Sequence, residues 1–360
     1  MKIKDFFDIK MCKRVYKNQR GENLPIPFYT IKTLGGVAED FISHELFDKL
    51  KNKYDYPNYG NVLISCSGTI GKTVKYNGED SYFQDSNIMW LSPKKDNIDQ
   101  DYIYYFLSNL SWNNLSTSTL KRLYKVDLLN LEIKYLPLHV QEKIGSFFKE
   151  LDELIELYSN KIEKMNTSFM FIKKNIIKKC NDRFENVSLK DIATFINGKA
   201  HEKLVSENGS IKLINSKFIA TNASVAKKVT KNICPTERGD ICIVMSDVPN
   251  GKALAKCYIA HGDEAVNQRV CIIRSDKFLP EVLMLLLNRN KKYLMFDDHV
   301  SQTNLKKEDI LNVNLPFIPL NIQSEIKQVL NEFDELLKEY NDLVNNYKCI
   351  KKYYLNKIFN

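Results

Sequence analysis

The chain has 360 residues, of which 53 are Lys or Arg and 44 are Asp or Glu, giving a formal net charge of +9. Hydrophobic residues make up 44% and charged residues 27%, which excludes a largely disordered chain and fits two or three globular domains. The longest apolar runs, such as residues 282–287, are too short to span a bilayer, and the charged start lacks the apolar core of a signal peptide. We therefore expect a cytoplasmic protein with no membrane partner.

Eight cysteines and five histidines are scattered along the chain. There is no Cys-x-x-Cys pair, and several cysteines, such as Cys242 and Cys271, lie in apolar runs where a free thiol behaves as a small core residue. The sequence therefore predicts no metal site and no disulfide framework. The basic balance favours a polyanionic partner, although a charge of +9 spread over 360 residues is only suggestive.

Two segments, residues 1–135 and 181–317, have the pattern of mixed α/β domains, in which Gly, Pro and Asn separate short runs. The β-rich runs are residues 61–65, 88–91, 241–245 and 270–273, and the expected helices are residues 101–110 and 279–288. Between and after these domains lie residues 136–180 and 318–360, which carry a different pattern.

Residues 136–180 and 318–360 each predict one long helix that begins near a proline, Pro137 or Pro319. Apolar residues recur at alternating spacings of three and four over about four heptads, which is typical of a coiled-coil seam. The expected seam residues are Leu151, Ile155, Tyr158, Ile162, Met165, Phe169, Ile172, Phe333, Leu337, Tyr340, Val344, Tyr347 and Tyr354. Lys351 is the one polar residue in the seam, and we expect it to fix the register or meet a partner. The alternative is that each helix packs only on its own domain.

The second half of the chain repeats the first at an offset of 182 residues. Residues 123–158 and 305–340 share 14 identities in 36 positions without a gap. The register extends backward more weakly, since residues 60–64 resemble residues 239–243. A period near 180 is too long for a solenoid and describes two domain-plus-helix modules in tandem.

This order resembles the specificity subunit of type I restriction–modification systems. The most specific matches are Pro-Leu-x-x-Gln-x-x-Ile at residues 137–144 and 319–326, supported by Asn197-Gly198-Lys199 and by residues 266–270. The resemblance implies an α+β fold with two mixed α/β target-recognition domains, residues 1–135 and 181–317. They would be joined by two spacer helices, residues 136–180 and 318–360, that pair as an antiparallel coiled coil in a pseudo-twofold tandem repeat.

The same resemblance implies bipartite recognition of double-stranded DNA, with the helices setting the spacing. Two similar domains on a stiff spacer can reach two half-sites about one helical turn apart, ~34 Å, and because the domains have diverged we expect the half-sites to differ in sequence. It implies no catalytic residue and no cofactor on this chain. S-adenosylmethionine, ATP and Mg would be bound by partners, namely two methylation subunits and the restriction subunits. The alternatives are a recognition subunit of another multisubunit restriction or methylation enzyme, and a coiled-coil scaffold that binds protein.

Residues 68–73 follow an apolar strand and resemble the end of a phosphate-binding loop. The residues after Lys72 favour a strand, whereas phosphate binding needs a helix there. A nucleotide site and a plain β-turn are therefore the alternatives to the reading that we favour, a turn that contacts DNA. Residues 251–252 would form the corresponding turn of the second module.

Hydroxyl and amide side chains with adjacent cations occupy residues 116–122 and 301–307. Such groups can contact base edges and phosphates, or their Ser, Thr and Asn can cap a short helix, and we give both readings equal weight. Residues 267–269 favour structural hydrogen bonding over base reading. The candidate DNA-binding residues are Thr69, Lys72, Ser118, Thr119, Lys121, Arg122, Lys199, Lys252, Ser301, Gln302, Asn304 and Lys306.

Overall fold

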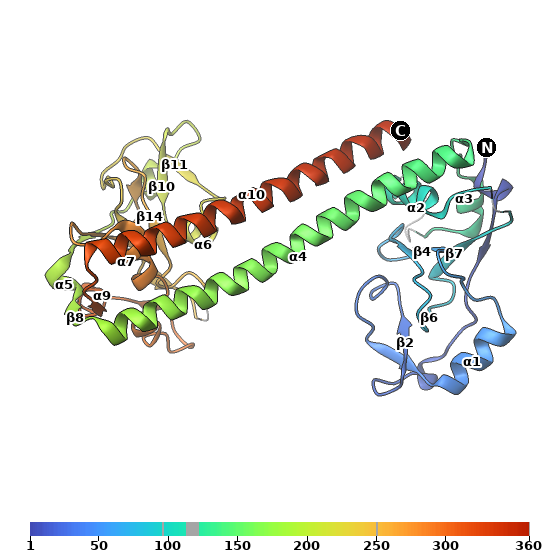
Figure 1. Cartoon of the computed structure of the whole chain (residues 1–360), viewed down its shortest axis with the longest axis horizontal. Helices are drawn as coiled ribbons and strands as arrows, with labels where there is room; N and C mark the ends of the chain where they lie inside the picture. The colour runs from blue at the N-terminus through green and yellow to red at the C-terminus, as the bar shows by residue number, and fades with distance from the viewer. Residues whose placement is uncertain (96, 113–121, 250, 360) are drawn as a thin grey trace. The chain divides into compact units, whose positions relative to one another are not determined.

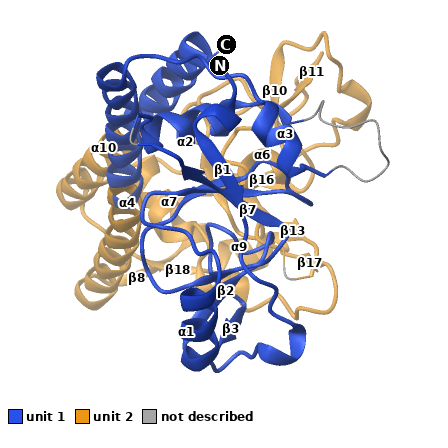
Figure 2. Cartoon of the chain, turned by 90° about the vertical axis from the view of Figure 1, so that its right-hand side faces the viewer, with its two compact units in different colours: residues 1–160, 341–360 blue, residues 161–340 orange. Residues whose placement is uncertain are grey.

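The computed structural model describes residues 1–95, 97–112, 122–249 and 251–359. The chain forms two compact units, coloured separately in Figure 2: unit 1 is Met1–Asn160 with Asn341–Asn360, and unit 2 is Lys161–Tyr340. Each unit contains one mixed α/β domain and a stretch of each of the two long helices. These helices are α4 (Leu138–Arg183) and α10 (Leu320–Phe359).

Unit 1 holds a four-stranded antiparallel sheet of order β1-β7-β4-β5 and a three-stranded sheet of order β3-β2-β6, in which β2 and β6 are parallel. The strands are β1 (Phe7–Lys10), β2 (Ile26–Tyr29), β3 (Asp40–Ile42), β4 (Val62–Ser65), β5 (Thr73–Lys75), β6 (Tyr82–Phe83) and β7 (Ile88–Pro93). The helices of this domain are α1 (His44–Lys53), α2 (Gln100–Asn109) and α3 (Lys125–Asn130), some of which are labelled in Figure 1.

Unit 2 repeats this plan with a four-stranded sheet of order β9-β16-β12-β14 and a three-stranded sheet of order β11-β10-β15, in which β10 and β15 are parallel. Two small pairs, β13 with β17 and β8 with β18, are added. The strands are β8 (Asn186–Ser188), β9 (Thr194–Asn197), β10 (Ile211–Ile214), β11 (Lys227–Val229), β12 (Ile241–Val244), β13 (Ser246–Asp247), β14 (Cys257–Ile259), β15 (Ala265–Val266), β16 (Val270–Arg274), β17 (Thr303–Asn304) and β18 (Asn314–Pro316). The helices are α5 (Leu189–Ile192), α6 (Ser216–Ala220), α7 (Pro280–Leu287), α8 (Lys291–Leu294) and α9 (Lys307–Leu311).

The continuous apolar runs in the central strands are explained by burial on both faces of the sheet. Successive side chains of a strand point to opposite faces, so neighbours enter different cores. In β4, Ile64 joins one hydrophobic core and Leu63 joins the other. In β12, Ile243 and Cys242 are divided between two cores in the same way.

The equivalence of the two domains confirms the tandem repeat and the mixed α/β fold. Strands β4 and β12, which begin just after Gly60 and Gly239, occupy the same place in their sheets, as the weak sequence match predicts. Helix α2 likewise follows β7 and helix α7 follows β16, which are the last strands in chain order of the two four-stranded sheets. They match the helices expected at residues 101–110 and 279–288. The duplication therefore covers the domains as well as the long helices.

Both long helices begin at the residue after a proline, Pro137 or Pro319, as predicted. Within unit 1, the ring of Phe147 on α4 contacts that of Tyr354 on α10, while Tyr158 further along α4 stacks on Tyr347, which lies earlier in α10. The paired positions run in opposite directions along the two helices, so the helices pair antiparallel within this unit.

The expected seam residues differ in burial. Three of them, Leu151, Phe169 and Val344, are buried, and most of the others are half-buried. Tyr354 is 40% exposed and contacts Phe147 at the edge of the helix pair, so it does not lie at the centre of the seam. In unit 2, Phe169 stacks on Phe333 with ring centroids 4.6 Å apart.

Lys351 lies where the sequence places a polar seam residue, and it bonds across the helix pair. Its ammonium donates to the carboxylate of Asp152 at 2.5 Å and lies 5.2 Å from the ring centroid of Tyr105 on α2. The hydroxyl of Tyr105 donates to the other oxygen of Asp152 at 2.9 Å. The polar seam position therefore ties α4, α10 and α2 together within unit 1.

The long helices also pack on the domains. The alternative prediction, that the apolar residues of each helix pack on a domain and not on the other helix, therefore holds in part. In unit 1, Phe148 of α4 and Phe359 of α10 join the cluster that contains Tyr105. In unit 2, Phe169 of α4 and Leu330 of α10 join the main core of the domain. Each unit is thus completed by residues from both long helices.

Candidate nucleic-acid interface

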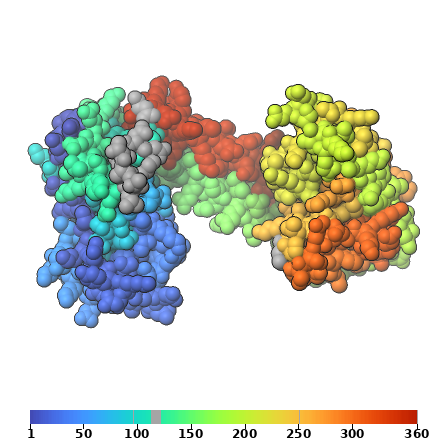
Figure 3. Space-filling model, turned by 180° about the vertical axis from the view of Figure 1, so that it is seen from behind, coloured from blue at the N-terminus to red at the C-terminus, as the bar shows by residue number. Residues whose placement is uncertain are grey.

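A two-stranded ribbon in unit 2 brings together candidate residues that lie about fifty positions apart in the sequence. Strands β13 and β17 pair antiparallel, with Ser246 opposite Asn304 and Asp247 opposite Thr303. On the face of unit 2 drawn in Figure 3, the surface of residues near 300 adjoins that of residues near 250. The loop with Lys252 and the segment with Gln302 therefore flank one element.

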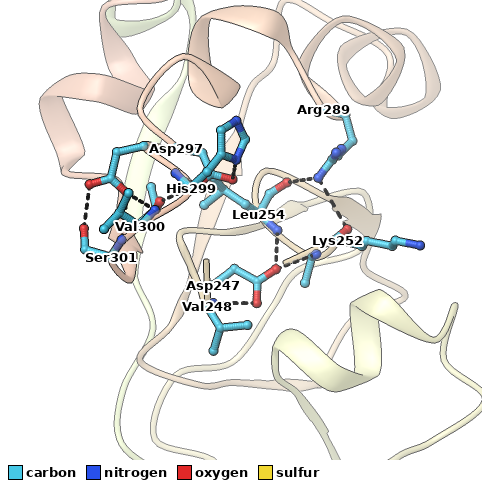
Figure 4. A network of polar contacts seen from close by, with 12 residues as sticks. Asp247, Val248, Lys252, Leu254, Arg289, Asp297, His299, Val300 and Ser301 are labelled. Carbon is cyan, nitrogen blue, oxygen red and sulfur yellow. Dashed lines mark hydrogen bonds and ion pairs between the residues drawn. The ribbon is translucent and has the colours of Figure 1, made fainter. Parts of the chain in front are cut away.

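The loop after β13 is held by the carboxylate of Asp247, as Figure 4 shows. It accepts hydrogen bonds from the backbone N–H groups of Val248 at 2.9 Å, Ala253 at 2.7 Å and Leu254 at 3.2 Å. A Cβ on Gly251 would lie 2.1 Å from the nearer oxygen of Asp247, so this close approach requires glycine. The turn exposes the side chain of Lys252.

The loop before β17 is held in the same manner by Asp298. Its carboxylate accepts from the backbone N–H groups of Val300 at 2.9 Å and Ser301 at 2.8 Å, and from the Ser301 hydroxyl at 2.7 Å. These hydrogen bonds lower the pKa of Asp298 to about 2, because they favour the ionised form. Ser301 therefore shapes the loop with its hydroxyl.

The prediction that a Ser, Thr or Asn residue caps the short helix that follows each candidate segment is wrong for α9 and α3. The residue at the N-cap of α9 is Lys306, and its backbone N–H donates to the carboxylate of Asp309 at 2.7 Å. At the N-cap of α3 the residue is Tyr124, whose N–H donates to Asp127 at 2.8 Å. The aspartate at the third position of each helix accepts from the N–H of the N-cap residue, and neither N-cap residue is a Ser, Thr or Asn.

Beside the ribbon lies a depression of about 550 Å³. Three candidate residues, Lys199, Gln302 and Asn304, line it together with Gln268 and Arg269. The side-chain amide of Gln302 donates to the Asn304 carbonyl oxygen at 3.2 Å. Two cations and several carboxamides face this space, and the described residues lining it include no carboxylate, so its chemistry suits an anionic, hydrogen-bonding ligand.

The three residues directly before β16, Asn267, Gln268 and Arg269, have different roles. The buried amide of Asn267 and the amide of Gln268 donate to the carboxylate of Glu202 at 3.0 and 3.3 Å, and the bond from Asn267 lowers the pKa of Glu202. These two residues thus make the structural hydrogen bonds that the sequence reading favoured. The guanidinium of Arg269 is exposed and has no hydrogen bond or ion pair within the described part of the chain.

In unit 1, the turn between β4 and β5 carries Thr69 and Lys72, both exposed. The hydroxyl of Ser65 accepts from the Lys72 N–H at 3.0 Å and donates to the Thr69 carbonyl oxygen. Strand β5 begins at Thr73, directly after this turn, so the helix that a phosphate-binding loop needs is not there. The nucleotide-site alternative therefore fails, and the turn remains a candidate for contacting DNA.

The remaining candidates of unit 1 are only partly described. Arg122 is half-buried, and its guanidinium donates to the Ser86 carbonyl oxygen at 2.7 Å. Ser118, Thr119 and Lys121 lie outside the described residues.

Comparison with known protein families gives a match over nearly the whole chain. Residues 1–167 and 181–346 each fit the family described as "Type I restriction modification DNA specificity domain". The chain belongs to this specificity family. The resemblance inferred from the repeated helix motifs is thereby confirmed.

Relatives within the specificity family cover parts of the chain. One is the putative type I restriction enzyme specificity subunit S.HindORF215P of Haemophilus influenzae, which is 41% identical over 154 residues, 43% of this chain and 40% of the relative. Another is the putative type I restriction enzyme MjaX specificity subunit of Methanocaldococcus jannaschii, 24% identical over 204 residues, 52% of this chain and 47% of the relative. The chain therefore spans less than half the length of these curated relatives.

Two solved structures share the fold over the full chain. The type I restriction–modification S subunit from M. genitalium superimposes with a TM-score of 0.61 at 16% identity, covering 100% of this chain and 95% of that one. A chain from a study of complex assembly and conformational transition of the type I R-M system has a TM-score of 0.61 at 13% identity, with 100% and 96% covered. At these identities the likeness concerns the fold alone.

For this specificity-family chain, the structure gathers Lys199, Gln302 and Asn304 at one depression, whereas Lys252 lies in the loop after β13 and does not line it. Lys306 is exposed at the start of α9. Sequence reasoning left Arg269 out of the candidates because it treated residues 267–269 as one structural group. The sequence distinguishes Arg269 from Asn267 and Gln268 only by its charge, and its lack of a bonding partner becomes visible in the structure.

Among the described residues, no helix combines the length and apolarity needed to cross a bilayer. In the same part of the chain, no three His, Cys, Asp or Glu side chains are grouped so that they could hold a metal ion.

Proposed function

We propose that this chain is the DNA-recognition subunit of a type I restriction–modification complex, in which each domain reads one half of a bipartite target. The observation that carries the proposal is the same two-sheet domain built twice, with different side chains at equivalent places. Directly before β16, unit 2 presents the guanidinium of Arg269, which is unpaired within the described part of the chain. Directly before the equivalent strand β7, unit 1 has Asn87, whose side-chain oxygen accepts from the Ser67 hydroxyl at 2.8 Å. Two such surfaces favour two different half-sites.

We further propose that α4 and α10 set the spacing between the half-sites and bind two methylation subunits. Apolar side chains at equivalent positions of the two helix repeats support this. Phe171 of α4 and Tyr353 of α10 are 65% and 57% exposed, and Leu138 and Leu320 are 37% and 64% exposed. A repeated surface of this kind suits two copies of one partner.

In this proposal the chain contributes recognition and its partners contribute the chemistry in the cytoplasm. S-adenosylmethionine would be bound by the methylation subunits, and ATP and Mg by the restriction subunits. The chain's own residues would hold the duplex through cations such as Lys72 and Lys252 while the partners act on it.

The proposal is tested by co-expressing the chain with a cognate methylation subunit and mapping methyladenine across a genome. One split motif is expected. Replacing residues 1–135 with the matching domain of another family member should change one half of the motif and leave the other half intact. Absence of a split motif, or a swap that changes neither half, would refute the proposal.

Binding to DNA also separates this function from that of a protein-binding scaffold. Because phosphate contacts release counterions, affinity for a duplex should fall steeply as the salt concentration rises. A scaffold would bind no duplex at low salt.

A further inference from the structure

We propose that Arg269 reads a guanine and that the carboxamides of Gln302 and Asn304 read an adjacent adenine, in the half-site recognised by unit 2. This assignment rests on the proposed function and divides the candidate residues into base readers and phosphate binders. Lys252, in the loop after β13 and outside the depression, binds phosphate only. Nothing in the family membership assigns these roles to particular side chains of this chain.

The backbone of Arg269 is fixed while its side chain is free. The Met245 N–H donates to the Arg269 carbonyl oxygen at 2.9 Å, and the Arg269 N–H donates to the side-chain oxygen of Asn267 at 3.4 Å. The nearby carboxylate of Glu202 accepts from the amides of Asn267 and Gln268 through one oxygen, Oε1, and makes no ion pair with Arg269 within the described part of the chain. The backbone of Arg269 is therefore held in place, while its guanidinium can extend toward a base edge. Direct readout requires both.

The chemistry of Arg269 matches one base best. A guanidinium offers two parallel N–H donors in a plane, and guanine presents two acceptors, O6 and N7, at its major-groove edge. No acidic side chain among the described residues lines the depression, and the nearby Glu202 does not hydrogen-bond the guanidinium, so its donors are available to a base.

Gln302 and Asn304 are placed as a pair. They are two residues apart in the extended segment that ends in β17, so their side chains lie on the same face, and the amide of Gln302 donates to Asn304 at 3.2 Å. Each carboxamide has both a donor and an acceptor, which complements N6 and N7 of adenine. The loop before them is held by Asp298, so the pair is presented from a defined backbone.

The ribbon itself suits the major groove, which admits a two-stranded β-ribbon. Ser246 of β13 and Asn304 of β17 lie opposite each other and both line the depression, and the loop with Lys252 follows β13. Lys252 does not line the depression, and its ammonium has no partner among the described residues. It is therefore placed to meet the DNA backbone beside the bases that the other residues read.

The test uses the full chain assembled with its methylation subunits and carries Arg269→Ala, Arg269→Lys or Lys252→Ala. Methylation mapping with Arg269→Ala should lose the preference at one guanine of one half-site. Affinity for the cognate duplex should fall about 5- to 150-fold, the range for one lost bidentate base contact. Arg269→Lys should relax the same position, because a single ammonium does not reproduce the planar fork.

Lys252→Ala is the matched control. It should weaken binding to cognate and altered duplexes equally, reduce the slope of log affinity against log salt by about one, and leave the motif unchanged. The half-site read by unit 1 serves as an internal control for folding, since it should remain intact in every variant.

The outcomes separate the two proposals. If the wild-type complex yields no split motif, the proposed function itself is refuted. A second outcome is that the wild-type complex yields the motif and the Arg269→Ala complex yields the same motif, with affinity lowered equally for all duplexes. Arg269 would then contact phosphate, and the assignment would be overturned. Loss of preference at a position without guanine would overturn it as well.

Discussion

Gln141 on α4 makes the same contacts in unit 1 that Gln323 on α10 makes in unit 2. Both side chains are almost fully buried. The carbonyl oxygen of Gln141 accepts from the N–H of Asp99, the N-cap of α2, at 3.0 Å, and its amide donates to the Leu136 carbonyl oxygen at 2.7 Å. Each glutamine thus joins the start of a long helix to the start of a domain helix.

In unit 2 the partners are equivalent. Gln323 accepts from the N–H of Leu279, the N-cap of α7, at 2.7 Å and donates to the carbonyl oxygens of Ile318 and Lys277 at 2.8 and 3.0 Å. The repeated glutamine of the sequence motif is therefore a junction between helix and domain. This explains why a polar residue recurs at a buried position.

Replacing Gln323 with Leu should destabilise unit 2 by about 2 kcal/mol or more, because buried backbone groups would lose their partners. Urea denaturation of the full chain measures the change. Gln328→Leu is the matched control, since that glutamine is exposed on the same helix and should have little effect. Equal stability of the two variants would show that the junction contributes nothing.

Replacing Phe359 with Ala should destabilise unit 1. Its ring lies 5.3 Å from that of Tyr102, 6.0 Å from Phe106 and 6.1 Å from Phe148, so the end of α10 completes the core of the first domain. Because Phe359 is half-buried, the expected loss is about 1–3 kcal/mol, below that for a fully buried phenylalanine. Thermal unfolding with exposed Tyr353→Ala as control tests this. A transition unchanged by Phe359→Ala would contradict the contact's role.

Alkaline pH should weaken unit 1 through Tyr105. Burial, followed by the nearby charge of Asp152 and the hydrogen bond to it, raises the pKa of Tyr105 above its ordinary value. The folded state therefore holds this proton to higher pH than the unfolded chain, whose tyrosines titrate near pH 10. Its contribution to stability is complete below about pH 10 and is lost as the pH rises further.

Tyr105→Phe should accordingly flatten the decline in unfolding free energy above about pH 10, although it removes one hydrogen bond at neutral pH. Tyr353→Phe, on the exposed side of α10, should leave the decline as steep as in the wild type. If the unfolding free energy of Tyr105→Phe declined as steeply with pH as that of the wild type, titration of Tyr105 would not be what weakens unit 1.

Acid should loosen the loop that presents Gln302. The hydrogen bonds from Val300 and Ser301 lower the pKa of Asp298 to about 2, so the stability they give is present above the unfolded pKa of about 4 and is lost as the pH falls through about 2. Asp298→Ala should remove the amide-exchange protection of Val300 and Ser301 at neutral pH. Asp276→Ala, at another exposed aspartate, should not.

The features predicted from the sequence are those with local or periodic causes. The heptad stripe, the prolines before both long helices and the apolar runs of β4 and β12 all reflect neighbouring residues, and the structure bears them out. The pairing of β13 with β17 joins residues about fifty positions apart and is too short to leave a pattern. Arg269 was missed for a related reason, since its lack of partners depends on where Glu202 lies in space.

Replacing Gly251 with Ala should disturb the ribbon through Asp247 alone. The added Cβ would lie 2.1 Å from the carboxylate, so this group must move and release the N–H groups of Ala253 and Leu254. Binding of unit 2 to its half-site should weaken, while the half of the methylation motif that unit 1 reads should persist. Gly36→Ala is the control, because the nearest atom to its Cβ would be a carbonyl oxygen 3.6 Å away.

A double-mutant cycle distinguishes this route from general damage to the loop. Asp247→Ala alone should weaken binding to a similar extent, and adding Gly251→Ala to it should cost little more, because the group that the new Cβ displaces is already gone. If the two changes were additive, the glycine would act independently of Asp247. The close approach of Gly251 to this carboxylate would then not be what shapes the loop.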